Sequence, residues 1–427
     1  MSDNESLLFG IFRNIRSKRN RKRILQNIEI ENENNKHIVR YKPSPIEAFF
    51  SPSDPLGNVM ISGGIPLLRN RAIIGSLQSA VNNGIGIVIL HAGNISLEAM
   101  VQQHYPGSVV FNRATAIYEP LMGLSNAEIC RMIQEATTTQ SDIPSAGQYY
   151  LEGMTEFIRS KNISPYCEMY ITCPHLELFD KVDEAEMKGY ITSALAQKIK
   201  TYLMQGQMHR SDVERYFNTL RHQAQGLLVN KLNLSYAKNL QMTIRNGDIS
   251  ILDIGSTSND LLLNLVFEDL SSSINSGRRA LVVIDGINLS ANDRVERFIK
   301  TSGGGVYTVI SSDDVYSALN ADDNLFNSCV GKSIKSIVYQ HASGVSCAKW
   351  ADVFGFYDKK EISNTYSNGQ NYQTMFSIIP GQAEGENLIV NIKRTHRILP
   401  EEINHIKKDE VYIYDSVNNE LAYTTVV

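Results

Sequence analysis

The fold of this chain is decided by one stretch, Gly57-Asn58-Val59-Met60-Ile61-Ser62-Gly63-Gly64-Ile65-Pro66-Leu67-Leu68-Arg69-Asn70-Arg71. Its apolar run from Val59 to Ser62 predicts a buried strand, and the glycine pair that follows predicts a tight turn. Apolar residues at helical spacing, beginning at about Arg71, predict a helix after the turn. Strand and helix alternate again further along the chain. Continuous apolar strands of this kind indicate a mainly parallel sheet, covered by helices on both faces, in an α/β fold.

A turn between a strand and a helix is where a phosphate-binding loop would lie, and such a loop needs the pattern G-x-x-x-x-G-K-[ST]. The second glycine lets backbone N–H groups approach the phosphates, the lysine neutralises them, and the hydroxyl holds Mg²⁺. Aligned from Gly63, with Gly64 beside it, the pattern meets Leu68, Arg69 and Asn70 at those three positions. The stretch therefore predicts a nucleotide site that has lost three of its four signature residues.

A nucleotide site also needs an acidic residue at the end of a neighbouring strand, where it holds Mg²⁺ through water. The strongest apolar run in the chain ends in Asp285, but Gly286 stands where a glutamate that activates water is expected. The next predicted strand ends in Ser311 and Ser312, without the amide that senses a γ-phosphate in motor ATPases. A second glycine–lysine pair, at 331–332, precedes a strand, so we do not expect it to bind phosphate.

Composition is typical of a soluble globular protein of two or three domains, with 42% apolar and 20% charged residues among 427. The sequence contains no run of about eighteen apolar residues, and its acidic start is not followed by a signal sequence. We therefore expect a cytoplasmic protein. The five cysteines lack metal-binding spacing and the nine histidines do not cluster, so we expect no metal site. His91 and His104 are interpreted as structural residues.

Charge is concentrated near the start of the chain, where residues 1–23 carry a net +5 although the whole chain carries −4. The remaining 404 residues therefore carry −9, and an acidic body is a poor partner for nucleic acid. Residues 7–12 are apolar and run directly into the basic cluster. This arrangement predicts peripheral contact with the inner face of a cell membrane or with another anion; a solvated tail and a segment that packs on a partner are the alternatives. The basic residues are Arg13, Arg16, Lys18, Arg19, Arg21, Lys22 and Arg23.

Hydrophobic periodicity divides the chain into five segments. Strand patterns stop after about Tyr118 and return at Ile249, and helical stripes fill the residues between them. Capping boxes at 125–128 and 211–214 open two of these helices. The predicted segments are a basic amphipathic segment (1–25), a linker (26–45), the first part of an α/β domain (46–118), an inserted all-α domain (119–244) and the second part of the α/β domain (245–427).

This order of elements resembles the type IV secretion and conjugation coupling proteins, which are TraG/TraD-like members of the FtsK/HerA class of P-loop ATPases. The resemblance covers roughly residues 46–427 and is carried by topology and spacing. His91-Ala92 stands where the family commonly has Asp-Pro. The segments that carry the likeness are the strand into the loop (57–64), the next strand (84–90), the entry to the inserted domain (117–121) and the segment similar to the family's closing strand (394–400).

The resemblance implies a RecA-like P-loop domain, an all-α domain that receives substrates, and assembly into a ring or another oligomer at the membrane. Family members normally begin with transmembrane helices, for which the basic N-terminal segment is a possible substitute. Because Leu68, Arg69, Asn70 and Gly286 all depart from the pattern, we expect no bound cofactor; ATP and Mg²⁺ would bind only if the site were still competent.

The resulting prediction is a pseudo-ATPase, a coupling-protein-like subunit or scaffold of a secretion or conjugation machine. It would recruit protein partners through its helical domain and could form an oligomer with an active ATPase. One alternative is an atypical ATP-dependent motor completed by a neighbouring subunit, with Asp285 holding the metal. Another is a nucleic-acid-binding module that acts through residues 13–23.

Overall fold

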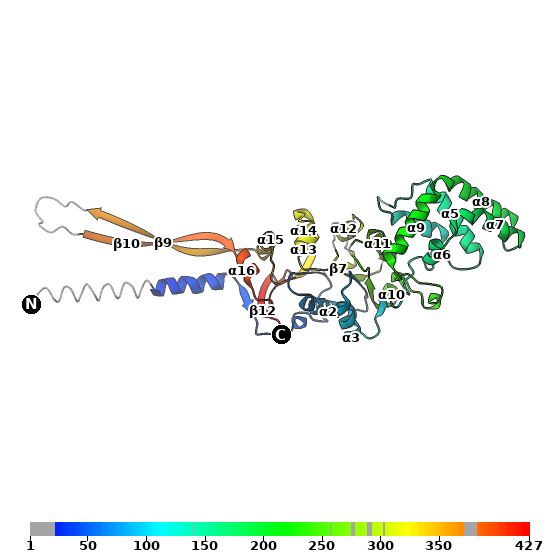
Figure 1. Cartoon of the computed structure of the whole chain (residues 1–427). Helices are drawn as coiled ribbons and strands as arrows, with labels where there is room; N and C mark the ends of the chain where they lie inside the picture. Colours follow the sequence, from blue (N-terminus) through cyan, green and yellow to red (C-terminus); the bar gives the residue numbers. More distant parts are fainter. Residues whose placement is uncertain are drawn as a thin grey trace, which may run out of the picture.

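A ten-stranded sheet forms the body of the protein (Figure 1). The computed structural model describes residues 22–139, 141–256, 258–274, 278–287, 293–301, 304–370 and 382–427. The strand order is β1-β12-β11-β8-β2-β7-β6-β3-β5-β4. The strands are β1 (Ile38–Arg40), β2 (Asn58–Ser62), β3 (Gly86–His91), β4 (Val109–Phe111), β5 (Ile249–Asp253), β6 (Ala280–Asp285), β7 (Val306–Ser312), β8 (Ser333–Val338), β11 (Glu410–Asp415) and β12 (Glu420–Thr425).

The seven strands from β8 to β4 run parallel, and β11 closes this part of the sheet by pairing antiparallel with β8. The predicted α/β fold with a mainly parallel central sheet is confirmed. Strand β7 lies between β2, which leads into the glycine turn, and β6, which ends in Asp285. All three strand ends therefore meet at the carboxyl edge of the sheet, where open α/β sheets bind ligands.

Two separate hydrophobic cores cover the two faces of the sheet, because successive side chains of a strand point to opposite faces. In β3, Ile87 and Ile89 belong to one core and Val88 and Leu90 to the other. This double burial explains why the strands read as continuous apolar runs. The helices of the body are α2 (Pro66–Asn82), α3 (Ile95–His104), α11 (Asp260–Ile274), α12 (Asp293–Thr301), α13 (Val315–Ala318), α14 (Asp323–Lys332), α15 (Gly344–Phe354) and α16 (Pro400–His405).

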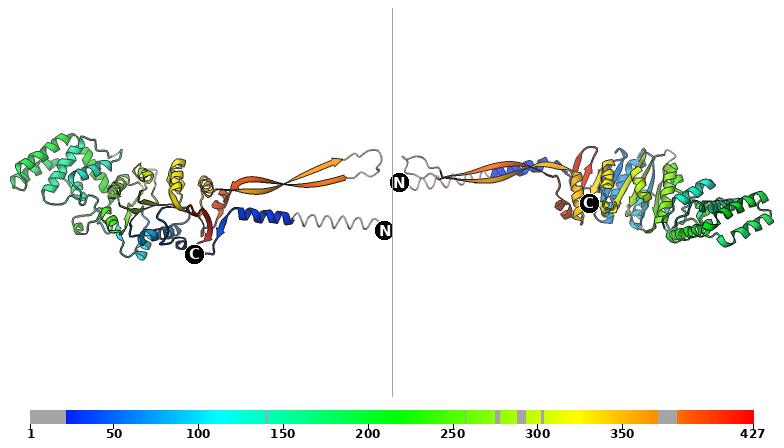
Figure 2. Two further views of the ribbon diagram at one scale, coloured as in Figure 1. Left: turned by 180° about the vertical axis from the view of Figure 1, so that it is seen from behind. Right: turned by 90° about the horizontal axis from the view of Figure 1, so that it is seen from above.

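Helices fill the segment between β4 and β5, and most of them form a lobe at one end of the molecule (Figures 1 and 2). The capping box at Ser125 is confirmed. The Ser125 hydroxyl accepts a hydrogen bond from the Glu128 N–H, and the Glu128 carboxylate accepts one from the Ser125 N–H. The one predicted at 211–214 is wrong, because the helix already begins at Arg210 and no side chain caps it. The helices are α4 (Asn126–Glu135), α5 (Gly147–Ser160), α6 (Cys167–Ile171), α7 (Leu178–Met187), α8 (Ser193–Gly206), α9 (Arg210–Ala224) and α10 (Leu240–Asn246).

A two-stranded antiparallel hairpin, β9 (Phe356–Gln370) and β10 (Gln382–His396), projects from the opposite end of the body (Figure 2). A helix over residues 22–35 extends on the same side. The two elements are joined at Asn32, whose side-chain amide exchanges hydrogen bonds of 2.9 and 2.8 Å with the backbone of Lys360. Residues 394–396, expected in a closing strand, lie in this hairpin instead; β11 and β12 complete the central sheet.

The linker predicted over residues 26–45 is not observed. These residues form most of the N-terminal helix and strand β1, which pairs parallel with β12 at the sheet edge. Their polar composition is typical of a linker, but Asn32 and the β1 backbone gain partners from residues more than 300 positions later. Sequence composition cannot show such partners, because they are brought together only by folding.

Candidate functional site

The turn after β2 is much shorter than a phosphate-binding loop requires. Strand β2 ends at Ser62 and α2 begins at Pro66, so only Gly63, Gly64 and Ile65 connect them. In a phosphate-binding loop, four residues already separate the two signature glycines, which is more than the whole turn contains here. The helix begins about five residues before the predicted position, because Pro66 occupies its first turn, where the fixed φ of proline is favourable. Residues 68–70 therefore lie inside the helix and not in a loop.

Protein groups already occupy the backbone N–H donors of this turn. The N–H of Gly63 donates to the Ser312 carbonyl (3.1 Å) and that of Gly64 to the Gln340 carbonyl (3.2 Å). Both glycines have positive φ, +83° and +70°. A Cβ on Gly64 would lie 2.8 Å from the Tyr339 side chain, so the glycine allows the end of β8 to pack against the turn. Close packing, and not an open phosphate cradle, explains the pair in this structure.

Arg69, at the position of the P-loop lysine, turns back onto the loop. Its Nη1 donates to the carbonyls of Gly64 (2.7 Å) and Gly63 (3.4 Å), and the residue is only 9% exposed. Leu68 is buried, and its carbonyl accepts a hydrogen bond from the Tyr339 hydroxyl (3.2 Å). His341 follows β8 and lies beside Gly63; burial lowers the pKa of its imidazole. The volume beside the glycines is thus lined by protein side chains.

Asp285, the predicted metal-binding acid, is also satisfied by protein groups. Its Oδ1 accepts a hydrogen bond from the Ser311 hydroxyl (2.6 Å) and its Oδ2 accepts one from the Asn94 amide (2.7 Å). The residue is 3% exposed. The Asn70 amide, in turn, lies 2.9 Å from both the Asn94 amide and the Ser96 hydroxyl. The acid and the residue at the Mg²⁺-ligand position of the pattern are therefore joined through Asn94.

Gly286 and Ser312 complete the predicted set at this edge of the sheet. Gly286 has φ +65°, its N–H donates to the Ser311 carbonyl, and open space surrounds the position of a Cβ. Ser312 is buried, and its hydroxyl donates to Asp313 (3.0 Å). The structure thus brings together the turn of Gly63 and Gly64 with the ends of β6 and β7, as parallel pairing of β2, β7 and β6 requires.

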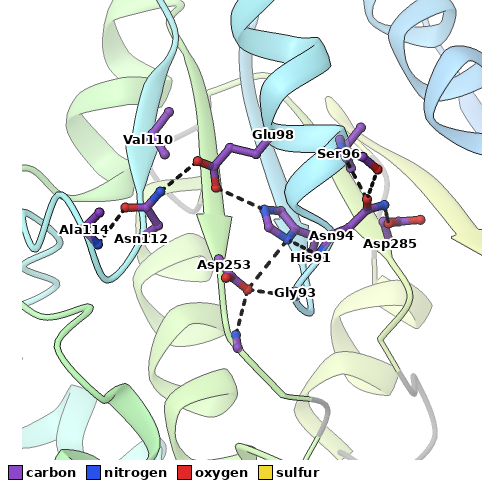
Figure 3. A network of polar contacts seen from close by, with 12 residues as sticks. His91, Gly93, Asn94, Ser96, Glu98, Val110, Asn112, Ala114, Asp253 and Asp285 are labelled. Atoms are coloured by element: carbon purple, nitrogen blue, oxygen red, sulfur yellow. Dashed lines mark hydrogen bonds and ion pairs between the residues drawn. The ribbon is translucent and has the colours of Figure 1, made fainter. Parts of the chain in front are cut away.

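A second polar cluster, missed from the sequence, surrounds His91 at the end of β3 (Figure 3). The imidazole is fully buried, and its Nδ1 accepts a hydrogen bond from the Asn94 N–H (3.0 Å). Its Nε2 has no hydrogen-bond partner in the described structure and lies 4.0 Å from a carboxylate oxygen of Glu98. Asp253, at the end of β5, lies 3.7 Å from Nδ1 and accepts hydrogen bonds from the N–H groups of Gly93 and Gly255.

Burial dominates the electrostatics of this cluster. It lowers the pKa of His91, although Asp253 and Asp285 oppose the effect, and it raises the pKa of Glu98. Glu98 also accepts a hydrogen bond from the Asn112 amide (2.8 Å), beside the turn that leads toward the inserted domain. The sequence alone indicates an isolated structural histidine at position 91. Its position at the end of an apolar run, like that of Asp253, was the available signal, because parallel strands bring such residues to one edge.

These residues do not fit Mg²⁺-nucleotide in the described arrangement. A nucleotide site needs free backbone donors, a cation directed at the phosphates and a carboxylate open to the metal shell. Here the donors of Gly63 and Gly64 are bonded, Arg69 binds carbonyl oxygens, and both oxygens of Asp285 accept protein hydrogen bonds. Among the described residues, no group of three or more His, Cys, Asp or Glu side chains has an arrangement that could hold a metal ion.

The predicted anion or membrane contact falls mainly on residues without a structural description. Arg13, Arg16, Lys18, Arg19 and Arg21 lie outside the described residues, whereas Lys22 and Arg23 are exposed in the first turn of the N-terminal helix. Within the described part of the chain, no helix combines the length and apolar character needed to cross a bilayer. Contact of these basic residues with an anion and their contact with a membrane surface both remain predictions.

The strand order, the acid that ends β6 and the helices inserted between β4 and β5 define a RecA-like α/β protein with an inserted helical lobe. Solved structures similar to this chain include the bacterial conjugative coupling protein TrwBdeltaN70 in an unbound form, with 11% identity, a TM-score of 0.48 and coverage of 90% of each chain. Plasmid coupling protein TrwB in complex with ADP and Mg²⁺ has 11% identity and a TM-score of 0.45, covering 87% of this chain and 85% of its own.

VirB4 of Thermoanaerobacter pseudethanolicus is also similar, with 11% identity, a TM-score of 0.38 and coverage of 69% of this chain and 80% of its own. The two TrwB structures are of coupling proteins, the kind of protein that the sequence resembles. No protein-family model matches the chain. No curated protein matches it by sequence.

Proposed function

We propose that this protein is a catalytically inactive RecA-like subunit, a pseudo-ATPase that serves as a scaffold in a secretion or conjugation machine. The observation that carries the proposal is the state of Asp285, whose two oxygens accept hydrogen bonds from Ser311 and Asn94. The bonded N–H groups of Gly63 and Gly64 support it, because nucleotide could bind only if these contacts were broken. The kind of machine is inferred from the resemblance of the sequence to conjugation coupling proteins.

Partner recruitment is assigned to the helical lobe because it exposes large, adaptable apolar side chains. Leu176, Met187 and Met208 are 76%, 81% and 89% exposed. Methionine is flexible and polarisable, and it is frequent at surfaces that bind several partners. Contiguous exposed apolar surface is typical of interaction sites, and these three side chains are the candidates for such a surface on the lobe.

The N-terminal helix supports a role for the basic segment at a membrane surface. It projects from the end of the body opposite the helical lobe, so this helix lies far from the proposed partner site (Figure 1). Cosedimentation with vesicles that contain about 30% phosphatidylserine tests this part. Binding that is lost on deletion of residues 1–21 is expected; equal binding of both proteins would contradict it.

Titration calorimetry of ATP with Mg²⁺ into the full chain tests the central proposal. No binding at millimolar nucleotide is expected. Micromolar binding would instead favour the motor completed in trans, particularly if hydrolysis appeared with a partner ATPase and was lost in Asp285→Ala. Asp180→Asn, which changes an exposed acid of the helical lobe, serves as the matched control in both assays.

A further inference from the structure

A pocket of about 350 Å³ opens between α4, the first helix of the inserted lobe, and helices α10 and α11 next to the sheet. This volume lies in the range of small-molecule sites, roughly 300–1,000 Å³. The pocket is distinct from the nucleotide-site region, since none of its lining residues belongs to the turn after β2 or to the ends of β6 and β7. The residues of its lining that matter here are Glu128, Arg131, Glu135, Glu268, Asp269 and Ser272.

Asp269 is the most informative of these residues because it is a carboxylate buried to 3% exposure. One of its oxygens, Oδ2, accepts hydrogen bonds from the Tyr118 hydroxyl (3.0 Å) and the Leu240 N–H (3.1 Å). The other oxygen has no hydrogen-bond partner in the described part of the chain, and the residue lines the pocket. This oxygen is not among the fully enclosed polar atoms that lack a partner in the described structure, so it can accept a hydrogen bond from a ligand in the pocket.

The charge around the pocket favours a cation as that ligand. Four carboxylates and Arg131 line it. Arg294 approaches Glu135 and Glu268 from α12, and Arg297 of the same helix also acts on Glu268. The net charge of these seven groups is −1 when all four acids are ionised, which for Asp269 requires a pH above about 7. Helices α4 and α11 end at Glu135 and Ile274, so the C-terminal ends of two helices border the pocket. The partial negative charge of a helix C-terminus stabilises a cation nearby.

We propose that this pocket binds a primary ammonium or guanidinium group, with Asp269 as its principal partner. The group would belong to a small molecule or to a lysine or arginine side chain of a partner protein. A ligand there would contact both α4 and α11 and so join the inserted lobe to the body. The proposal is independent of whether the protein binds nucleotide.

Titration calorimetry of the full chain with n-propylguanidinium chloride tests the site at pH 8.5, where Asp269 is ionised, with n-propylurea as a neutral probe of nearly the same shape. We expect n-propylguanidinium to bind saturably and n-propylurea not to bind. Asp269→Asn should weaken it at least tenfold, because the amide keeps an acceptor for Tyr118 and Leu240 but carries no charge. Asp180→Asn, the same change at an exposed position of α7, should leave the affinity within twofold.

A second variant keeps the test valid if Asp269→Asn does not fold, which thermal unfolding of each variant would show. Ser272→Arg leaves Asp269 in place and adds a guanidinium at the pocket, so it should abolish binding of the free probe. The proposal is overturned if n-propylurea binds as tightly as n-propylguanidinium. It is also overturned if the folded variants bind the guanidinium as tightly as the unchanged protein.

Two further probes identify the source of the cation. A capped Gly-Arg-Gly peptide that binds at least tenfold more tightly than n-propylguanidinium supports a side chain from a partner protein. Spermidine or n-propylguanidinium that binds as tightly as the peptide supports a small molecule. If none of the three cations binds, the pocket is not a cation site.

Discussion

Asn94 donates a hydrogen bond of 2.7 Å to Asp285, which places a side chain from the start of α3 on the oxygen that a Mg²⁺ shell would need (Figure 3). The same asparagine caps α3, where its Oδ1 accepts from the Leu97 N–H (3.1 Å). One residue thus fixes both the helix and the acid. Asn94 therefore joins the start of α3 to the end of β6.

Asn94→Ala should lower the free energy of unfolding by roughly 2–4 kcal/mol, because it removes a helix cap and leaves a buried carboxylate oxygen without a donor. Ser343→Ala removes only a cap, that of α15, and should lower it by about 1 kcal/mol. Urea denaturation measures both values. Equal losses in the two variants would mean that the contact with Asp285 contributes nothing.

Gly64→Ala should be more destabilising than Gly84→Ala, although both glycines have similar positive φ values of +70° and +62°. Strain in the left-handed region alone costs about 1–2 kcal/mol. A Cβ at position 64 would also lie 2.8 Å from Tyr339, whereas nothing lies within 4 Å of one at position 84. We expect a further loss of roughly 1–3 kcal/mol at position 64 from overpacking. Similar unfolding midpoints for the two variants would show that the turn can open.

Restoring the signature residues should not restore hydrolysis. The combined variant Leu68→Gly, Arg69→Lys, Asn70→Thr and Gly286→Glu recreates the residue types of an active site but not the long loop, because α2 still begins at Pro66. A glutamate at position 286 must also adopt φ near +65°. Phosphate release should stay at background in a coupled assay. Mg²⁺-dependent turnover that disappears on adding Asp285→Ala would refute the pseudo-ATPase proposal.

Stability should fall as pH rises from about 4 to about 7, through two acids buried at the base of the inserted lobe. Burial raises the pKa of Glu119 to about 7 and that of Asp269 to about 7. In this window the folded protein keeps protons that the unfolded chain releases, so each pH unit removes stability, by at most about 1.4 kcal/mol for each group. Above pH 7 both states are ionised and this contribution becomes constant.

Glu119→Gln should reduce the slope of this pH dependence to roughly half, since the amide carries no proton to lose and only Asp269 still releases one. Urea denaturation at pH 5, 6, 7 and 8 measures the slope. Glu177→Gln, at an exposed position before α7, should leave the slope unchanged. An unchanged slope in Glu119→Gln as well would show that Glu119 does not retain its proton in the folded protein.

Much of the fold could be predicted from the sequence because its signals are local. The apolar runs that end in Ser62, His91, Asp285 and Ser312 are strands, and the helical stripes between β4 and β5 are helices. The predicted linker over 26–45 was wrong because its partners lie more than 300 positions later. The segment 394–400 does not close the central sheet, because residues 394–396 pair with β9 in the hairpin. Neither the charged N-terminal helix nor the hairpin of β9 and β10 has a hydrophobic periodicity that would identify its position in the fold.

The sequence by itself determined that the signature residues of a nucleotide site are absent and that the acid, the serines and the glycines meet at one sheet edge. Only the tertiary structure decided what occupies that edge. Tyr339 packs on Gly64, and Asn94 reaches Asp285 across 191 positions of sequence. The physical reason is that hydrogen bonding and close packing depend on which side chains the strand order brings within about 3–4 Å, and no single segment of sequence contains that information.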